Sequence, residues 1–256
     1  MQTEQPPKPC REVPINMKSA IILFDFDGTL ADTFESGARL INQFAEQFGY
    51  SKIDFAKHKD LSARQLVKLS GVKWWQIPRL VRFFRRESAK HADEIKPFDG
   101  VVEMVQQLSQ HCDVGILSTN SAETVVKFLT NNALDSYFCY IKTNVPLFGK
   151  SRALRRAVRF LRRNYTFILY VGDEIRDIEA CRKVGLDIIS VSWGFNSYAA
   201  LTLLNQNVVE STDALLEFLS KKMNYGSNWK SNATGTHNLV SPVTGSAPNS
   251  IEIEKE

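Results

Sequence analysis

The chain has 256 residues, of which 43% are hydrophobic and 23% charged, the composition of a globular protein with a substantial core. Its 32 basic and 28 acidic residues leave a net charge of +4, too small to indicate a nucleic-acid-binding protein. No segment reaches the roughly 20 consecutive apolar residues that a membrane-spanning helix needs. We therefore expect neither a nucleic-acid nor a membrane partner.

The two ends of the chain differ in composition from its middle. Residues 1–18 are polar and rich in proline, without the apolar stretch of a secretory signal, and residues 222–256 lose all periodicity. The four cysteines lack the spacing of a zinc site or a disulfide framework. We expect a disordered lead, a disordered tail and a cytoplasmic protein.

Short apolar runs alternate with amphipathic helical patterns through most of the chain. The predicted strands are residues 20–24, 113–118, 137–142, 166–171 and 187–191, and the predicted helices are residues 122–131, 150–163 and 175–184. This alternation is typical of βαβ crossovers. It predicts an α/β fold with a doubly wound, mainly parallel, Rossmann-like sheet.

One interval breaks the alternation. Between Leu30 and Pro97 about sixty residues show helical periodicity and no convincing strand. We predict a small helical cap, residues 33–96, inserted after the first strand, and a core formed by residues 19–32 and 97–221. The apolar stripes of this segment, its phenylalanines and its tryptophans are expected to form its own core.

Two stretches are rich in arginine. In residues 151–163 the apolar positions fall on one helical face, which predicts that the arginines form the solvated face. Residues 73–86 mix arginines with aromatic residues inside the predicted cap. There Arg79, Arg82 or Arg85 could reach the leaving group of an anionic substrate, and the sequence does not choose among them.

The first predicted strand ends in two acids, Asp25 and Asp27, followed by Gly28. Because the chain turns at a strand end, both carboxylates can converge on one cavity. One acid can then act as a nucleophile while the other handles a proton. With a divalent cation, such a pair suits phosphoryl transfer.

Three further groups of polar residues follow later strands, at the edge where open α/β sheets bind ligands. Hydroxyls and backbone N–H groups could hold a phosphate at Ser118-Thr119-Asn120, although Ser118 could equally be a helix N-cap. Lys150 offers a cation. Asp173 and Asp177 share a helical face and suit Mg²⁺, unless Asp177 only caps the helix or pairs with Arg176 or Lys183. Glu174 is expected to be solvated.

Read in order, the segments DFDGTLADT, ILSTN, FGKS and VGDEIRDIEACRKVG resemble the four motifs of the haloacid dehalogenase superfamily. The resemblance covers about residues 19–221 and is closest to the phosphoglycolate phosphatase-like branch, whose members carry a helical cap after the first motif. The DxDGT and GDxxxD patterns are specific, whereas a lone DxD pair is weak.

The resemblance implies a role for each motif residue. Asp25 would be the nucleophile that forms an aspartyl-phosphate, and Asp27 the general acid and base. Mg²⁺ would be held by Asp25, Asp173, the backbone carbonyl of Asp27, and Asp177. The transferring phosphoryl group would be bound by Ser118 or Thr119, with Asn120 nearby, and screened by Lys150.

These observations predict a Mg²⁺-dependent phosphatase that acts on a small phosphorylated metabolite, possibly phosphoglycolate. Asp27 argues against dehalogenation, because a departing halide needs no proton. Two alternatives remain open at this stage: a sugar-phosphate mutase with the same core, and a catalytically idle member that acts as a binding or regulatory domain.

Overall fold

The computed structural model describes residues 20–223. Six parallel strands form one sheet in the order β5-β4-β1-β6-β7-β8. The strands are β1 (Ala20–Phe24), β4 (Asp113–Leu117), β5 (Phe138–Lys142), β6 (Phe167–Gly172), β7 (Asp187–Val191) and β8 (Val208–Val209). The predicted α/β class with a doubly wound parallel sheet is confirmed.

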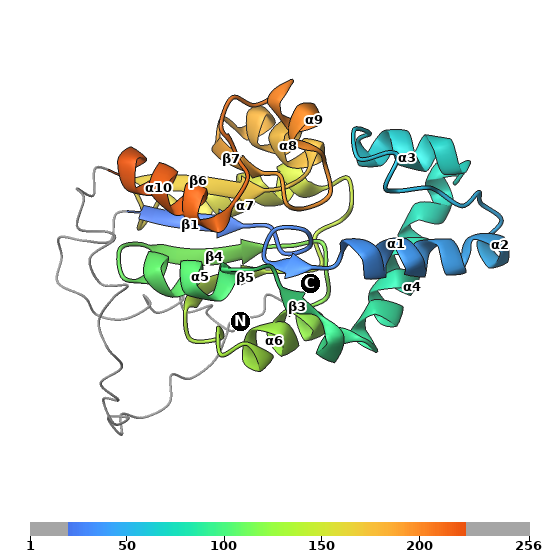
Figure 1. Cartoon of the computed structure of the whole chain (residues 1–256), viewed down its shortest axis with the longest axis horizontal. Helices are drawn as coiled ribbons and strands as arrows, with labels where there is room; N and C mark the ends of the chain where they lie inside the picture. Colours follow the sequence, from blue (N-terminus) through green and yellow to red (C-terminus); the bar gives the residue numbers. More distant parts are fainter. Residues whose placement is uncertain (1–19, 224–256) are drawn as a thin grey trace, which may run out of the picture.

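Helices cover both faces of this sheet (Figure 1). The helices of the chain after residue 97 are α5 (Val101–Ser109), α6 (Ala122–Asn131), α7 (Lys150–Leu161), α8 (Ile175–Val184), α9 (Tyr198–Thr202) and α10 (Thr212–Lys222). The predicted helix bounds agree at α6 and α8, whereas α7 ends two residues earlier than expected. Strands β4 and β5 each differ from the prediction by one residue at one end, and β6 is shifted by one residue at both ends.

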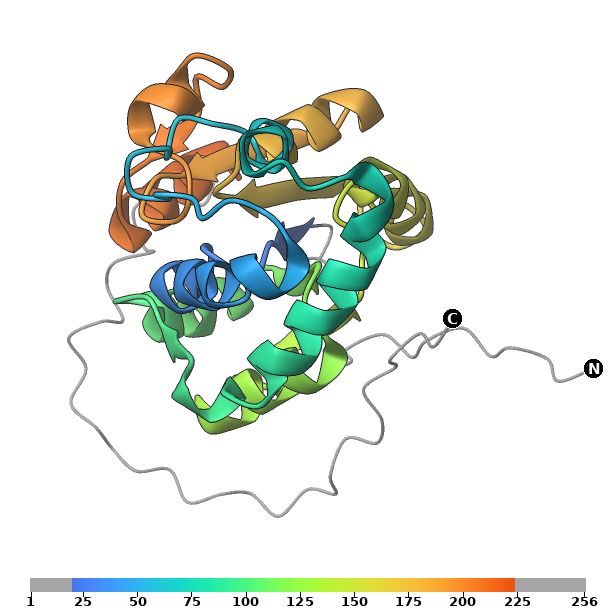
Figure 2. The same ribbon diagram turned by 90° about the vertical axis from the view of Figure 1, so that its right-hand side faces the viewer.

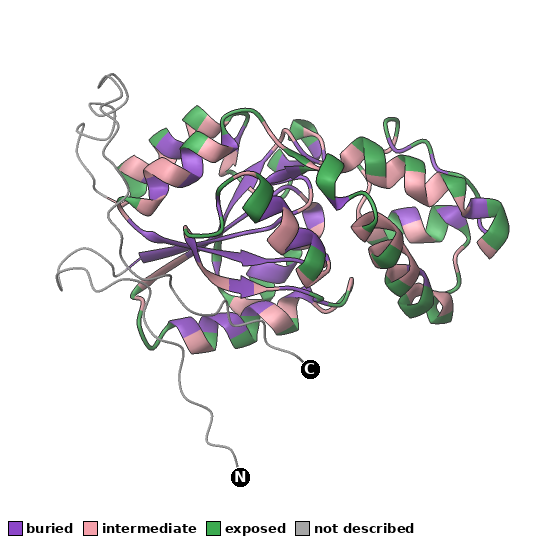
Figure 3. Ribbon diagram, turned by 90° about the horizontal axis from the view of Figure 1, so that it is seen from below, coloured by how far each residue is buried: buried purple, intermediate pink, exposed green. Residues whose placement is uncertain are grey.

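The central strand β1 shows how the sequence sets the two layers. All five of its residues are buried, and alternate side chains face opposite sides. Ile22 and Phe24 pack with α5, α6 and α10, while Ile21 and Leu23 pack with α7 and α8. Full burial of one such side chain contributes about 1.5–3 kcal/mol. In Figure 3 the strands at the centre of the sheet are coloured mostly as buried.

The basic stretch of α7 agrees with its prediction. Its apolar face is buried, formed by Leu154, Ala157, Val158 and Leu161, and the arginines at 152, 155, 156 and 159 are exposed. Core packing therefore explains this pattern of arginines without a nucleic-acid ligand.

Residues 33–95, called here the helical segment, lie beyond the carboxyl ends of the strands (Figures 1 and 2). They contain α1 (Phe34–Gln43), α2 (Ala45–Phe48), α3 (Ala63–Ser70), η1 (Trp74–Gln76), α4 (Ile77–Ala89) and η2 (Ala92–Glu94). The expectation of no strand between residues 30 and 97 was wrong. β2 (Ala31–Asp32) and β3 (Lys96–Pro97) form a two-residue antiparallel pair, too short to produce a pattern of alternation.

Two small clusters hold the helical segment together. Ala45, Tyr50 and Leu80 form one buried cluster, and Ile53, Phe55 and Leu66 form the other. The expectation that the tryptophans belong to this core was wrong, because Trp74 is 78% and Trp75 62% exposed. Leu69, placed in the apolar stripe from its spacing, is 51% exposed. Leu69 lies on α3 and the two tryptophans lie on η1, and none of the three belongs to either cluster.

The ends of the described chain bear on two further expectations. The expected tail starts later than residue 222, because Lys222 is the last residue of α10. The rest of that tail and the expected lead, residues 1–18, lie outside the described residues. Of the helices between residues 20 and 223, none has the length and apolarity required to cross a bilayer.

Candidate active site

The sheet brings the predicted site residues together at one edge. Asp25 follows β1, Asp173 follows β6, Asp177 lies in the first turn of α8, and oxygen atoms of all three lie within 4.8 Å of one another. All three side chains are buried. Buried carboxylates at this spacing repel one another unless cations accompany them, and carboxylate oxygens are the ligands that Mg²⁺ prefers.

One such cation is Lys150, the first residue of α7 and itself buried. Its Nζ donates to Asp25 Oδ2 at 2.5 Å and also forms an ion pair with Asp177. Burial favours the neutral amine, but Asp177 and Asp25 outweigh it and raise the pKa of Lys150. The lysine is therefore charged and neutralises part of the carboxylate cluster.

Asp173 is held by the turn that follows β1. It accepts hydrogen bonds from Thr29 Oγ1 at 2.9 Å and from the Phe195 N–H at 2.7 Å. Gly28, with φ +76°, lies against this carboxylate, and a Cβ at residue 28 would stand 2.1 Å from Asp173 Oδ2. Burial and the neighbouring carboxylates raise the pKa of Asp173 well above its usual value. A bound cation would offset that repulsion.

Asp177 has two roles that the sequence left as alternatives to metal binding. Its Oδ2 accepts from the Glu174 N–H at 3.1 Å, which caps α8, and its ion-pair partner is Lys150. Neither Arg176 nor Lys183, the two alternative partners that the sequence offered, forms an ion pair with Asp177 among the described residues. Burial and nearby carboxylates raise the pKa of Asp177 to about 6.

Asp27 lies outside the three-carboxylate cluster and has its own hydrogen-bond donors. Asn120 Nδ2 donates to Asp27 Oδ1 at 3.0 Å, and Thr33 Oγ1 donates to the same oxygen at 3.1 Å. Burial and the charge of Asp25 raise the pKa of Asp27, while the two donors oppose that rise. A raised pKa and a fixed orientation suit a residue that delivers and accepts a proton.

Ser118, Thr119 and Asn120, which follow β4, make different contacts at the site. Ser118 is buried, and its Oγ accepts from the Asn120 N–H at 2.9 Å. The alternative of Ser118 as a helix N-cap was wrong, because Ser121 caps α6. Asn120 orients Asp27, and the backbone carbonyl of Thr119 accepts from Arg85.

Glu174 and Arg176 form an ion pair of 2.6 Å beside the cluster, and both side chains are largely buried. The expectation that Glu174 is solvated was therefore wrong. Its side chain turns back to cap α8 and to meet the arginine, so that α8 begins with a buried pair.

The helical segment contacts the site edge through polar side chains. Arg85 of α4 donates to the backbone carbonyls of Thr119 at 2.7 Å and Val145 at 2.8 Å, so it does not point freely toward a ligand. Arg79 and Arg82, the other two candidates for reaching a substrate, are exposed. In the loop after β7, Asn196 donates to the carbonyls of Lys59 and Leu61 and accepts from the Ile175 N–H.

Sequence reasoning missed several residues that shape the site: Thr29, Thr33, Arg176 and Asn196. Thr29 follows the DxDG turn directly, so its position was a usable signal. Thr33 bonds to Asp27, 6 residues away, and Asn196 bonds to residues 21, 135 and 137 positions away, so both reach their partners through the folded chain. No local pattern could have identified them.

Comparisons with known proteins agree with this geometry. Residues 22–191 match the family described as haloacid dehalogenase-like hydrolase. The chain is 35% identical over 207 residues to a phosphoglycolate phosphatase of Synechococcus elongatus, covering 79% of this chain and 98% of that protein. It is 26% identical over 215 residues to the pyrophosphatase PpaX of Bacillus mycoides, covering 80% of this chain and 99% of that protein.

Solved structures share the fold. A predicted phosphatase from Clostridium acetobutylicum superposes with a TM-score of 0.66 at 20% identity, covering 80% of this chain and 98% of the other. A phosphoglycolate phosphatase-like protein from Lactobacillus delbrueckii gives 0.60 at 21% identity, covering 78% and 97%. The chain belongs to the haloacid dehalogenase-like hydrolase family.

Proposed function

We propose that this protein is a Mg²⁺-dependent phosphomonoesterase that works through a phosphorylated Asp25. The observation that carries the proposal is the buried cluster of Asp25, Asp173 and Asp177, with Lys150 paired to two of its members. Three carboxylates and one ammonium leave an excess of negative charge in a buried place. Burying this excess charge lowers the stability of the fold, and a bound divalent cation would neutralise it.

The donor set fits Mg²⁺, because it consists of hard carboxylate oxygens and includes no sulfur or imidazole. Asp25, Asp173 and Asp177 would hold the ion, together with the backbone carbonyl of Asp27. When bound, the ion supplies neutralisation of the charge that develops on the phosphoryl oxygens.

The residues of the chain supply the bond changes. In the first step Asp25 attacks phosphorus, the bond from phosphorus to the ester oxygen breaks, and Asp27 gives its proton to the departing alkoxide. In the second step Asp27 takes a proton from water, whose oxygen attacks phosphorus and displaces the Asp25 carboxylate. Phosphate leaves and Asp27 is protonated again, so the cycle closes.

The remaining predicted residues position the phosphoryl group. We assign Ser118 and Lys150 to its oxygens, because both are buried beside the strand ends that carry Asp25. Thr119 and Asn120 lie in the same loop, and Asn120 also fixes the orientation of Asp27. Phosphoryl transfer depends mostly on such positioning and on charge stabilisation.

We assign residues 33–96 to a cap that covers this site, and residues 19–32 and 97–221 to the catalytic core. Closing a cap excludes water while Asp25 is being phosphorylated, and opening it admits the water of the second step. The substrate class is a small phosphorylated metabolite in the cytoplasm. Phosphoglycolate is the first choice, because a relative that carries that name is 35% identical.

The test is phosphate release from phosphoglycolate, pyrophosphate, several sugar phosphates and p-nitrophenyl phosphate, with Mg²⁺ or with EDTA. We expect turnover of at least one compound that is lost with EDTA. The Asp25→Asn variant should lose at least about 10³-fold in kcat with its circular dichroism unchanged, since no covalent route remains. Turnover retained in Asp25→Asn would refute the proposed mechanism.

A further inference from the structure

Arg176, in the first turn of α8, has hydrogen-bonding groups that the described chain does not use. Its Nη2 pairs with Glu174, but its Nε and Nη1 are buried and have no hydrogen-bond partner. A buried donor without an acceptor costs about 1–3 kcal/mol, and more when it is charged. Because native proteins rarely keep such groups unsatisfied, an acceptor is expected beside this guanidinium.

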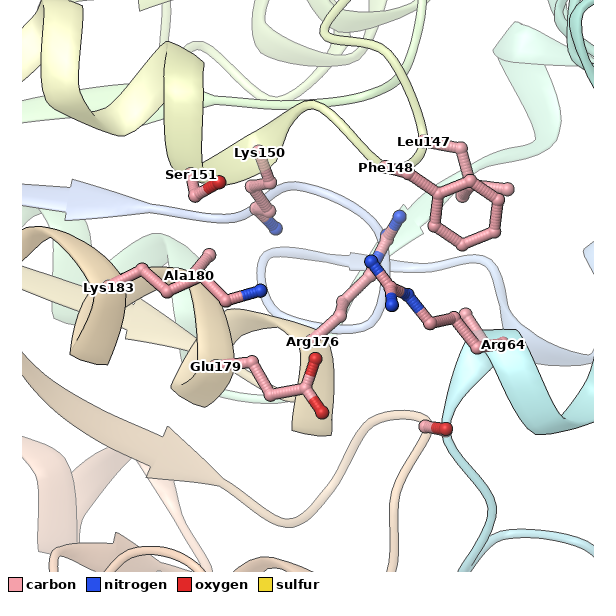
Figure 4. A pocket seen from close by; sticks show the side chains of 11 residues that line it. Arg64, Leu147, Phe148, Lys150, Ser151, Arg176, Glu179, Ala180 and Lys183 are labelled. Carbon is pink, nitrogen blue, oxygen red and sulfur yellow. The ribbon is translucent and has the colours of Figure 1, made fainter.

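A cavity of about 40 Å³ adjoins Arg176 (Figure 4). Its walls come from both parts of the molecule: Arg64 at the start of α3 in the helical segment, Phe148 in the loop before α7, and Arg176 and Lys183 on α8. This volume would hold roughly three water molecules, or one small polyatomic ion in their place. The Arg64 guanidinium lies 5.6 Å from the centre of the Phe148 ring, which holds it at the cavity.

The charges around the cavity favour an anion. Arg64 and Lys183 form no ion pair with any residue between positions 20 and 223. Glu179 is the acidic residue that lines the cavity, and Arg176 is already paired with Glu174, so Arg64 and Lys183 leave the lining with an excess of positive charge. Lys150 also borders it, but Asp25 and Asp177 already neutralise that lysine. The cavity is therefore next to the carboxylate cluster and opposite to it in charge.

We propose that this cavity binds a second oxyanion, separate from the phosphoryl group that Asp25 attacks. Arg64 and Arg176 approach it from the helical segment and from the core, and planar guanidinium groups bind carboxylates and phosphates with two parallel hydrogen bonds. The oxyanion satisfies the unpaired nitrogens of Arg176 and holds the two parts of the molecule together. Its source is either the distal carboxylate or phosphate of the substrate, which rests on the proposed function, or a free inorganic oxyanion.

Kinetics with two substrates tests the first source. Phosphoglycolate carries a carboxylate beyond its phosphate, whereas ethyl phosphate carries none. We expect Arg64→Gln to lower the ratio of kcat/KM for phosphoglycolate over ethyl phosphate by about tenfold or more, mainly through KM. Arg159→Gln, which removes an exposed arginine of α7 that does not line the cavity, should leave that ratio unchanged.

Calorimetric titration of the Mg²⁺-loaded protein with inorganic phosphate tests the second source without any turnover. The expected stoichiometry is two ions for the wild type and for Arg159→Gln, and one for Arg64→Gln. A loss of one ion with an unchanged substrate ratio assigns the cavity to a free oxyanion. The proposal is overturned if Arg64→Gln keeps both the ratio and the stoichiometry, or if Arg159→Gln shows the same losses as Arg64→Gln. A wild type that turns over nothing overturns the proposed function instead, because the phosphate titration still reports on the cavity.

Discussion

The sheet core and the helical segment are stabilised in different ways. Strands β1 and β4 are buried at every residue, whereas α1 has no buried residue and α4 buries only Leu80. The helical segment relies on edge-to-face aromatic contacts, such as Phe44 with Phe83, and on polar contacts with the core. Elements with few buried apolar contacts open more easily than a packed sheet. The carboxylate cluster therefore lies at the edge of the tightly packed sheet core, and the more loosely packed helical segment lies beyond that edge.

The largest effect on stability is expected when the buried lysine of the core, Lys150, is replaced. Lys150→Met leaves Asp25 and Asp177 buried without their cation, which should lower the free energy of unfolding by about 3–5 kcal/mol and abolish turnover. The matched variant Lys127→Met removes an exposed pair with Asp93, between α6 and η2, and should leave the unfolding midpoint nearly unchanged. Urea unfolding without Mg²⁺ measures both. Equal midpoints for the two variants would contradict the assigned role of Lys150.

Glycines give a second matched pair, because Gly28 and Gly71 have nearly the same φ, +76° and +74°. A Cβ at Gly71 would meet no atom within 4 Å, so Gly71→Ala should cost only the left-handed backbone penalty, about 1–2 kcal/mol. A Cβ at Gly28 would overlap Asp173, so Gly28→Ala should cost about 1–3 kcal/mol more and reduce turnover. Thermal unfolding measures the stability loss of both variants, and kcat measures their turnover. Similar stability losses would mean that the Asp173 side chain moves aside freely.

The contrast between the regions also explains what could be predicted from the sequence. Strand β1 is five consecutive apolar residues that end in two acids, so both its burial and its chemistry are local in the sequence. The neighbours in the sheet follow from the alternation of strands and helices. Asp25, Asp173 and Lys150 could be placed together because parallel strands end at one edge.

The helical segment could not be predicted in the same detail. Trp74 and Trp75 are large apolar residues of the kind that forms cores, yet both side chains are exposed. The position of the short helix that carries them depends on packing between helices, which the periodicity of the sequence does not specify. The sequence could not distinguish Arg85 from Arg79 and Arg82. The structure does, because the loops after β4 and β5 provide the backbone carbonyls to which Arg85 donates. Contacts between distant loops leave no local pattern in the sequence.

Arg85 offers a test of how the two regions are joined. Arg85→Met removes donors to the carbonyls of Thr119 and Val145, which lie in the loops after β4 and β5. Loss of about 1.5 kcal/mol of docking free energy corresponds to a decrease in kcat/KM of roughly tenfold. Faster hydrogen exchange in α4 should accompany it. Arg82→Met, in the same helix and exposed, should change neither quantity, and a similar loss there would point to net charge rather than docking.

The smallest expected effect comes from Thr33, at the junction of the two regions. Thr33 Oγ1 donates to Asp27 Oδ1, and this bond lowers the pKa of Asp27 against the rise caused by burial and Asp25. Thr33→Val removes the donor with little change of shape, so the pKa of Asp27 should rise further. Asp27 must be protonated when the alkoxide departs, so kcat falls as pH increases through that pKa. The alkaline limb of the pH profile should therefore move to higher pH, with kcat at the optimum changed by less than about threefold. A limb that moves to lower pH would show that the residue that titrates there is not Asp27.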